Sequence, residues 1–299
     1  MAEMLAGGRG ERGTVGPVLR YPGSKWGLAK RIVGMMPEHQ RYIEPFAGSA
    51  AMLLAKPRSD VEIINDLDDE LVNLYSVLRD RMKRAQLIEY VELTPYAEAE
   101  MRAVCSASPT EDAVERARRY LVRSWLDIAG LRPHSTPCFR LPGEKQSNIR
   151  PARVWSRLPE RIARVGIRLK DVEIRSIDAV RFIASQNSPN TLVYADPPYL
   201  HETRASKRYY NHEMSDADHL RLIEALLTHT GPVLLSGYDS ALYRDALAGR
   251  GWRRYEFLGR QQNRRPGSPA KREIVWANPE AVESSSDERV PLFDLQAIT

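Results

Sequence analysis

A strand, a glycine turn, a small-residue helix and a second strand follow one another between residues 42 and 66, and this order constrains the fold more than any other feature. Tyr42-Ile43 leads into the turn Glu44-Pro-Phe-Ala-Gly48, a helix covers Ser49–Ala55, and the second strand, Val61–Ile64, ends at Asn65-Asp66. This alternation is typical of doubly wound α/β sheets. The segment therefore predicts the first half of such a sheet.

A second group of apolar segments completes the predicted sheet. Thr191–Ala195 and Pro232–Ser236 are short apolar runs of the kind found in buried parallel strands, and a helix from about Asp216 to His229 lies between them. Further strands are predicted at residues 172–174, 252–258 and 272–276, of which the last two form a closing hairpin.

Residues 79–171, between these two halves, lack the alternation of strand and helix. Glu98–Ala103 and Glu111–Ile128 predict helices, and residues 133–151 predict a loop rich in Pro, Gly, Ser and Asn. Positive charge is concentrated here, because residues 111–175 contain 15 Lys/Arg and 8 Asp/Glu in a chain of net charge +5. Such a regional positive field favours a polyanionic partner. The sequence thus predicts one α/β sheet that is split by a basic, mainly helical insertion.

Composition and chain ends exclude several classes of protein. No apolar stretch reaches the roughly 18–20 residues of a membrane span, and the first 16 residues lack the apolar region of a secretory signal. Cys105 and Cys138 have neither metal-ligand spacing nor a disulfide framework, so free thiols in a reducing compartment are expected. We predict a cytoplasmic protein with a flexible leader over residues 1–16 and a disordered, acidic tail over residues 279–299.

The tetrapeptide Asp196, Pro197, Pro198 and Tyr199, which ends the strand Thr191–Ala195, is the strongest indication of function. The carboxylate accepts hydrogen bonds from an amino group, and the prolines remove two backbone donors while their carbonyls remain acceptors. The tyrosine offers a flat face to a planar ring. Together they predict a pocket for an exocyclic amine on an aromatic base, although two prolines after a strand also form ordinary turns.

Four more residues are expected at the carboxyl ends of the strands, where open α/β sheets bind ligands. Gly48 allows a ligand to approach the backbone, and Asp66 stands where doubly wound proteins place an acid on ribose hydroxyls. Lys25, in the turn Arg20–Lys25, can bind a carboxylate, and Asp178 can accept from an adenine amino group. Each has an ordinary alternative: Asp66 also suits a helix N-cap, and Lys25 a solvated surface. Because the chain lacks G-x-G-x-x-G and a phosphate-binding loop, the set fits a nucleoside that carries an amino acid better than a pyrophosphate.

The chain resembles the Dam-like DNA adenine methyltransferases over residues 19–78 and 172–278. It has the motifs of that family in the same order: Arg20-Tyr-Pro-Gly-Ser-Lys25, Glu44-Pro-Phe-Ala-Gly48, Asn65-Asp66 and Asp196-Pro-Pro-Tyr199. The resemblance implies a Rossmann-like sheet that binds S-adenosylmethionine, with catalytic parts at residues 17–78 and 172–278 and a target-recognition insertion at 79–171. It also implies that the methyl group is transferred to N6 of an adenine flipped out of DNA.

The resemblance further implies a role for each matching residue. Asp196 and the Pro197 carbonyl would bind the target amino group, and Tyr199 would stack on the base. Lys25 would bind the methionine carboxylate, whereas Asp178 would lie near the adenine of the cofactor. The implied site comprises Asp196, Pro197, Pro198 and Tyr199 for catalysis and Tyr21, Lys25, Glu44, Phe46, Gly48, Asp66 and Asp178 for the cofactor.

Two departures from the family pattern stand close to these residues. Ser49-Ala50 replaces the glycines of many members, and Ala179 follows Asp178 where a phenylalanine is usual. The second departure puts the adenine contact of Asp178 in doubt.

Double-stranded DNA is the implied partner, and basic residues are its candidate contacts. Arginine contacts phosphate or binds guanine in a bidentate manner. The alternative is a solvated helix face with ion pairs such as Glu115 with Arg119. The candidate DNA-binding residues are Arg116, Arg119, Arg123 and Arg132 in the insertion and Arg204, Lys207 and Arg208 after the tetrapeptide.

Other functions and partners remain open at the level of sequence. N4-cytosine methyltransferases more often carry Ser at the position of Asp196, and related RNA or protein-glutamine methyltransferases carry Asn. A catalytically inactive DNA-binding module is a different class, which cofactor binding would distinguish. The tail segment Arg289–Leu295 faintly resembles peptides that dock on the sliding clamp. We expect a monomer or weak dimer at the nucleoid of a bacterial or phage-type system.

Overall fold

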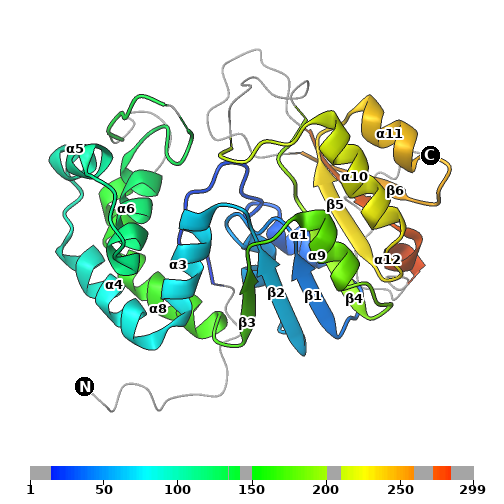
Figure 1. Ribbon diagram of the computed structural model, residues 1–299, viewed down its shortest axis with the longest axis horizontal. Helices are drawn as coiled ribbons and strands as arrows, with labels where there is room; N and C mark the ends of the chain where they lie inside the picture. Colours follow the sequence, from blue (N-terminus) through cyan, green and yellow to red (C-terminus); the bar gives the residue numbers. More distant parts are fainter. Residues whose placement is uncertain (1–14, 134, 142–149, 201–209, 259–271, 284–299) are drawn as a thin grey trace.

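A seven-stranded sheet forms the centre of the computed structural model, which describes residues 15–133, 135–141, 150–200, 210–258 and 272–283 (Figure 1). The strand order is β3-β2-β1-β4-β5-β7-β6, and β7 runs in the direction opposite to the other six strands. The chain order reverses between β1 and β4, which makes their carboxyl ends the switch point of the sheet. The strands are β1 (Arg41–Glu44), β2 (Val61–Asn65), β3 (Val172–Arg175), β4 (Thr191–Ala195), β5 (Val233–Gly237), β6 (Arg253–Leu258) and β7 (Arg272–Ala277).

The strands confirm the predicted α/β sheet. β4 and β5 are buried at every position, as parallel strands covered on both faces must be. Each predicted strand is present with ends that differ by at most one residue, and β6 and β7 form the predicted closing hairpin.

Helices cover both faces of the sheet, because alternate strand residues enter two different hydrophobic clusters. Ile43 belongs to the cluster that includes apolar residues of α9, α10 and α11, whereas its neighbour Tyr42 belongs to the cluster that includes α1 and α2. No helix in the described residues is long and apolar enough to cross a membrane. The bounds are α1 (Ala29–Val33), α2 (Ala51–Ala55), α9 (Ala179–Ser185), α10 (Asp216–Leu227), α11 (Ala241–Leu247) and α12 (Pro279–Glu283).

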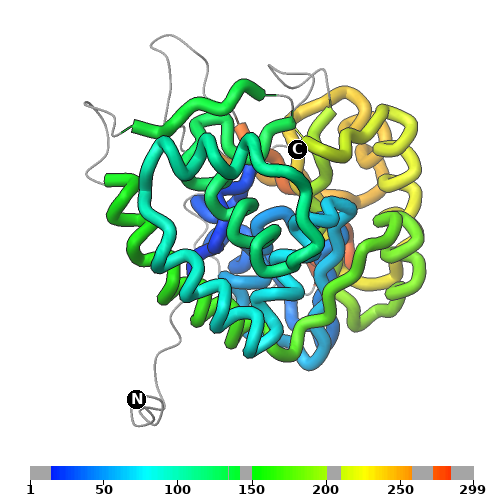
Figure 2. The backbone as a smooth tube through the Cα atoms, turned by 60° about the vertical axis from the view of Figure 1, so that its left-hand side comes forward, coloured from blue at the N-terminus to red at the C-terminus, as the bar shows by residue number. Residues whose placement is uncertain are grey.

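The helices of the insertion share a core with the sheet. Leu121 of α6 and Ile162 of α8 are fully buried and belong to the same cluster as Tyr42 of β1 and Leu74 of α3, the helix that precedes the insertion. Figure 2 shows these helices, coloured cyan and green, packed together beside the sheet. The predicted boundary at residue 79 falls at the end of α3. Residues on both sides of this boundary belong to the same hydrophobic cluster. The helices are α3 (Asp69–Arg79), α4 (Arg81–Leu93), α5 (Glu98–Ser106), α6 (Ala113–Leu126), α7 (Pro151–Trp155) and α8 (Leu158–Arg168).

The sequence located only part of this helical structure. It predicted α5 and α6, with ends shifted by up to three residues, but not α4, in which only Leu87 and Val91 are buried and the apolar pattern is weak. The helix predicted from Ser49 begins at Ala51, because Ala50 adopts a left-handed conformation with φ of 50°. Of the predicted leader over residues 1–16 and the predicted disordered tail over residues 279–299, residues 1–14 and 284–299 lie outside the described residues. The tail prediction begins too early, because residues 279–283 form α12, in which Ala281 is buried.

We expect Gly166→Ala to destabilise the protein, although alanine has the higher helix propensity. A Cβ at this position of α8 would lie 2.6 Å from the Leu78 carbonyl oxygen and would also collide with Arg84, so α8 would have to move away from α3. The free energy of unfolding should fall by about 1–3 kcal/mol in a urea titration. Gly27→Ala is the control, since nothing lies within 4 Å of its Cβ. Equal stability of the two variants would contradict the packing.

Candidate functional site

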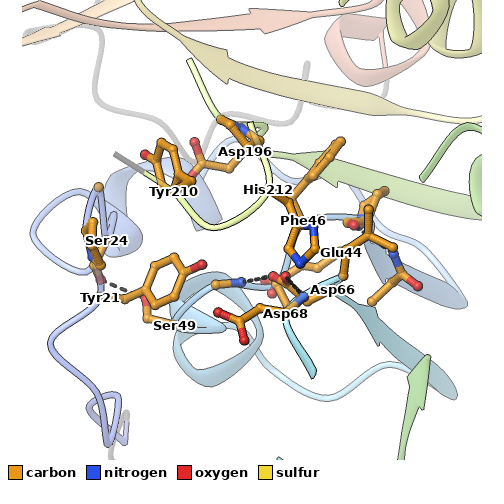
Figure 3. A pocket seen from close by; sticks show the side chains of 18 of the residues that line it. Tyr21, Ser24, Glu44, Phe46, Ser49, Asp66, Asp68, Asp196, Tyr210 and His212 are labelled. Carbon is orange, nitrogen blue, oxygen red and sulfur yellow. Dashed lines mark hydrogen bonds between the residues drawn. The ribbon is translucent and has the colours of Figure 1, made fainter. Parts of the chain in front are cut away.

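A cavity at the carboxyl ends of β1, β2 and β4 encloses about 920 Å³ when the open solvent at its mouth is included. Its walls come from five segments far apart in the sequence, residues 21–25, 44–52, 65–68, 194–198 and 210–214, and from Ala179. In Figure 3, Asp66 and Asp68 lie on one side of this cavity and Asp196 and Tyr210 on the opposite side. Of the predicted site residues, the wall contains Tyr21, Lys25, Glu44, Phe46, Gly48, Asp66, Asp196 and Pro198.

Glu44, the last residue of β1, presents a buried acceptor to this cavity. Its Oε1 accepts hydrogen bonds from the Tyr42 hydroxyl at 2.6 Å and from the Leu53 amide at 2.7 Å. Oε2 is buried without a hydrogen-bond partner among the described residues. Burial raises the pKa of Glu44 to about 7, although both hydrogen bonds oppose this shift. A donor group of a ligand would satisfy this oxygen.

Asp66 fixes the turn that follows β1. Its two carboxylate oxygens accept the backbone amides of Gly48 at 2.9 Å and Asp68 at 3.0 Å. Gly48 has φ of 44°, and a Cβ there would lie 3.0 Å from the Tyr21 ring, so the turn requires glycine. Burial raises the pKa of Asp66, and the two amides oppose this shift. Asp66 is therefore not the helix N-cap that the sequence also allowed.

Asp68 is the N-cap of α3 and connects three parts of the chain. Its Oδ1 accepts from the amides of Glu70 and Leu71, while Oδ2 accepts from the Tyr120 hydroxyl at 3.1 Å and from Asn211 Nδ2 at 2.8 Å. The cavity wall is thereby joined to α6 of the insertion and to the segment 210–214. Sequence analysis assigned Asp68 no function, although an Asp before an apolar helical pattern is a capping signal.

Lys25, which is buried, forms an ion pair at the cavity with Asp196, whose side chain is 19% exposed. The Lys25 ammonium lies 2.9 Å from Asp196 Oδ1 and 2.8 Å from the Gly23 carbonyl oxygen. Burial alone would lower the pKa of Lys25, but the carboxylates of Asp196 and Glu273 raise it above its usual value. Within the described residues, both polar contacts of Asp196 fall on Oδ1, so Oδ2 remains available as an acceptor.

Tyr199 is placed behind Asp196 and outside the cavity wall. Its hydroxyl lies 3.2 Å from Asp196 Oδ1, and its ring packs edge-on against Tyr238 at 4.4 Å between centroids. The side chain is only 6% exposed. In this conformation the ring offers little surface to a stacked base, because protein groups already cover it.

Asp178 also lies outside the cavity wall. It caps α9, where Oδ1 accepts the Arg181 amide at 3.0 Å, and it is 3.9 Å from Arg221 at the surface. The following residue, Ala179, lines the cavity in its place. A helix N-cap and a ligand-binding acid have the same local sequence, so the sequence could not separate them.

Glu273 of β7 is a buried member of this site that sequence analysis did not assign. It lies 3.6 Å from the Lys25 ammonium and accepts a hydrogen bond from the Tyr199 hydroxyl. The available signal was an acid at the start of an otherwise apolar strand.

The candidate DNA-binding arginines differ in their surroundings. Arg116 is bound to Glu70 at 2.9 Å, and Arg119 to Glu115 at 2.7 Å, which is the ion pair that the alternative interpretation expected. Arg123 and Arg132 are exposed. The remaining candidates, Arg204, Lys207 and Arg208, lie outside the described residues.

The chain is similar to several known proteins. The family model described as D12 class N6 adenine-specific DNA methyltransferase matches residues 21–126 and 141–260. Over 219 residues, 69% of this chain and 74% of the relative, it is 30% identical to the Type II methyltransferase M1.LlaDCHI of Lactococcus lactis subsp. cremoris. Over 237 residues, 76% of this chain and 82% of the relative, it is 24% identical to a DNA adenine methylase of Salmonella typhi. A solved structure, the rRNA methyltransferase aviRa from Streptomyces viridochromogenes, is 13% identical to this chain. The two match over 90% of this chain and 92% of the length of aviRa, with a TM-score of 0.39.

Asp68→Ala should cost more stability than Asp112→Ala, the matched N-cap variant. Both aspartates accept two backbone amides at a helix start, but only Asp68 also binds Tyr120 and Asn211. Loss of a cap costs about 0.5–2 kcal/mol, and two more unpaired groups should add about 1–3 kcal/mol. Chemical unfolding of both variants measures the difference. If Asp68→Ala lowers the free energy of unfolding by no more than Asp112→Ala does, the contacts of Asp68 with Tyr120 and Asn211 contribute nothing to stability.

Proposed function

Because this chain belongs to the D12 class of N6 adenine-specific DNA methyltransferases, and so methylates adenine in DNA with S-adenosylmethionine, we propose that the transfer takes place at the cavity described above. The observation that carries this proposal is the position of Asp196. Asp196 and Glu44 line the same cavity, and among the described residues neither Asp196 Oδ2 nor Glu44 Oε2 has a hydrogen-bond partner, so one site offers acceptors to two different amino groups.

The residues at β1 and β2 fit the cofactor. Glu44 Oε2 is an acceptor for the amino group of the methionine part, and the turn at Phe46–Gly48 allows a ligand to approach the backbone. Asp66 lies at the end of β2, where an acid suits the ribose, although both its oxygens already accept amides. When bound, S-adenosylmethionine supplies an activated methyl group on a good leaving group.

Asp196 orients the acceptor amine in this proposal. The adenine N6 is a poor nucleophile because its lone pair is delocalised into the ring. Asp196 Oδ2 and the Pro197 carbonyl would accept its two N–H groups and favour a pyramidal nitrogen that points toward the methyl donor. Alignment of this kind supplies a large share of a rate enhancement. No covalent intermediate with the protein is required.

Lys25 holds Asp196 in position rather than holding the cofactor. The Lys25 ammonium lies 2.9 Å from Asp196 Oδ1 and donates to the Gly23 carbonyl at 2.8 Å, and Glu273 Oε1 lies 3.6 Å away. The methionine carboxylate that the family resemblance assigns to Lys25 would have to share the ammonium with these groups.

The target adenine must leave the duplex to reach this cavity, at a cost of a few kcal/mol. We propose that Arg123 and Arg132, which are exposed, contact the DNA, whereas Arg116 and Arg119 would first have to exchange their carboxylate partners. Contacts to phosphates would make binding weaken steeply with salt. Expression in a methylation-free host, followed by sequencing of its modified bases, would identify the recognition sequence.

The sliding-clamp contact, the monomeric or weakly dimeric state and the nucleoid location stay predictions. The clamp-like segment Arg289–Leu295 lies outside the described residues.

Asp196→Ala should lower methyl transfer by at least about 100-fold while S-adenosylmethionine still binds. The reason is that the substitution removes the acceptor for the amine but no group at Glu44 or Asp66. Transfer of a tritium-labelled methyl group and calorimetry of cofactor binding measure the two effects. Asp171→Ala is the control, because Asp171 is 73% exposed and lies outside the cavity wall. Appreciable turnover of Asp196→Ala would refute the proposed role.

Cofactor binding should weaken as the pH falls below about 7. Burial raises the pKa of Glu44 to about 7, so below that pH its carboxyl group is mostly protonated. The protonated carboxyl group carries no negative charge with which to bind an ammonium group. The affinity should change by up to about tenfold per pH unit below 7 and level off above it. Calorimetry at pH 6.5 in two buffers of different ionisation enthalpy should also detect proton release. A pH dependence that persists in Glu44→Gln would assign it to another group.

A further inference from the structure

Glu273 stands behind the acceptor that the proposed reaction uses. It is the second residue of β7, is 8% exposed and does not line the cavity. Its Oε1 contacts both the Lys25 ammonium, at 3.6 Å, and the Tyr199 hydroxyl. These two groups also contact Asp196, and on one oxygen only, at 2.9 Å and 3.2 Å to Oδ1. Lys25 and Tyr199 therefore connect the two carboxylates.

The charges in this cluster do not cancel. Two carboxylates share one ammonium group in a buried setting, where an unpaired charge is expensive. Burial raises the pKa of Glu273, while the Lys25 ammonium opposes this shift. The Tyr199 ring lies beneath the same ammonium, at 4.7 Å between Nζ and the ring centroid. Each acid therefore limits how strongly Lys25 and Tyr199 can bind to the other.

We propose that Glu273 is a positioning residue for methyl transfer, which holds Lys25 and the Tyr199 hydroxyl so that they bind only Oδ1 of Asp196 and leave Oδ2 to the target amine. This inference rests on the proposed role of Asp196. Without the charge of Glu273, Lys25 and Tyr199 would bind Asp196 alone. The Asp196 carboxylate would then be a weaker acceptor and free to turn toward Lys25.

The contacts separate this function from that of the cofactor groups. Glu273 touches neither Glu44 nor Asp66 among its contacts within the described residues, and it is absent from the cavity wall. Its removal should therefore change the rate of the transfer step without changing the affinity for S-adenosylmethionine. If Glu273 had only a structural function, its removal would change the stability of the protein and not specifically the rate of the transfer step.

Glu273→Gln tests the proposal with the full-length protein, DNA and S-adenosylmethionine. Glutamine keeps the size and an acceptor oxygen but removes the charge. We expect kcat to fall about 10–100-fold, because small misplacements of reacting groups cost rates of this order, with cofactor affinity within about twofold of wild type. Glu256→Gln is the matched control, since Glu256 lies on the paired strand β6 and its ion pairs among the described residues are with Arg254 and Arg272.

The pH profile adds a measurement that a structural function would not alter. Among the described residues, the charged and titratable groups that face Glu273 are Lys25, Asp196, Tyr199 and Tyr194. Protonation of Glu273 should contribute to the loss of kcat on the acid side in the wild type, because burial raises its pKa. In Glu273→Gln this acid limb should move to lower pH. If Glu273→Gln does not fold, Glu273→Asp is the second variant, because it keeps the negative charge but moves it away from Lys25 and Tyr199. Its kcat should also fall, with cofactor affinity retained.

A wild-type kcat in Glu273→Gln, or parallel losses of kcat and cofactor affinity, would overturn the inference. If Asp196→Ala is inactive while Glu273→Gln has normal kcat, only the function of Glu273 fails. If Asp196→Ala retains turnover, the proposed function of the cavity fails as well.

Discussion

The ion pair between Lys25 and Asp196 joins two ends of the fold that the sheet alone would leave separate. Lys25 belongs to the turn before α1, and Asp196 directly follows β4 at the switch point of the sheet. Because the Lys25 ammonium is buried, it needs the Asp196 carboxylate to compensate its charge. This ion pair holds the N-terminal turn against the carboxyl ends of β1 and β4, so that residues 21–25 form one wall of the cavity. The site therefore depends both on the sheet topology, which brings these strand ends together, and on the ion pair, which attaches the turn to them.

The insertion is bound to this framework by polar contacts as well as by its shared core. The backbone of Arg20 exchanges hydrogen bonds with the Ser124 hydroxyl of α6, and Trp125 donates to the Val18 carbonyl. These contacts lie only a few residues before Lys25. The helix that carries Arg123 is therefore held in a defined position relative to the turn that contains Lys25.

The sequence predicted the sheet better than the site. β4 and β5 were visible because they are buried at every position, and the carboxyl ends of β1, β2 and β4 indicated where a ligand binds. α4 was not visible, since only Leu87 and Val91 of this helix are buried. Asp178 and Asp196 look alike in sequence, as acids next to an apolar segment, yet one caps a helix at the surface and the other pairs with the buried Lys25. Glu273 could not be assigned because both of its partners are distant in the chain.

The single hydrophobic core under the sheet and the insertion has a consequence for how such proteins diversify. A recognition unit with its own core can be exchanged between proteins as a cassette, with little effect on its host. Here Leu74, Leu121 and Ile162 fill space together with Tyr42, so a foreign insertion would have to reproduce their volumes, and also the close approach at Gly166. New DNA specificities should therefore arise in this lineage through substitutions at the exposed surface and in loops, one position at a time, and not through recombination of whole units.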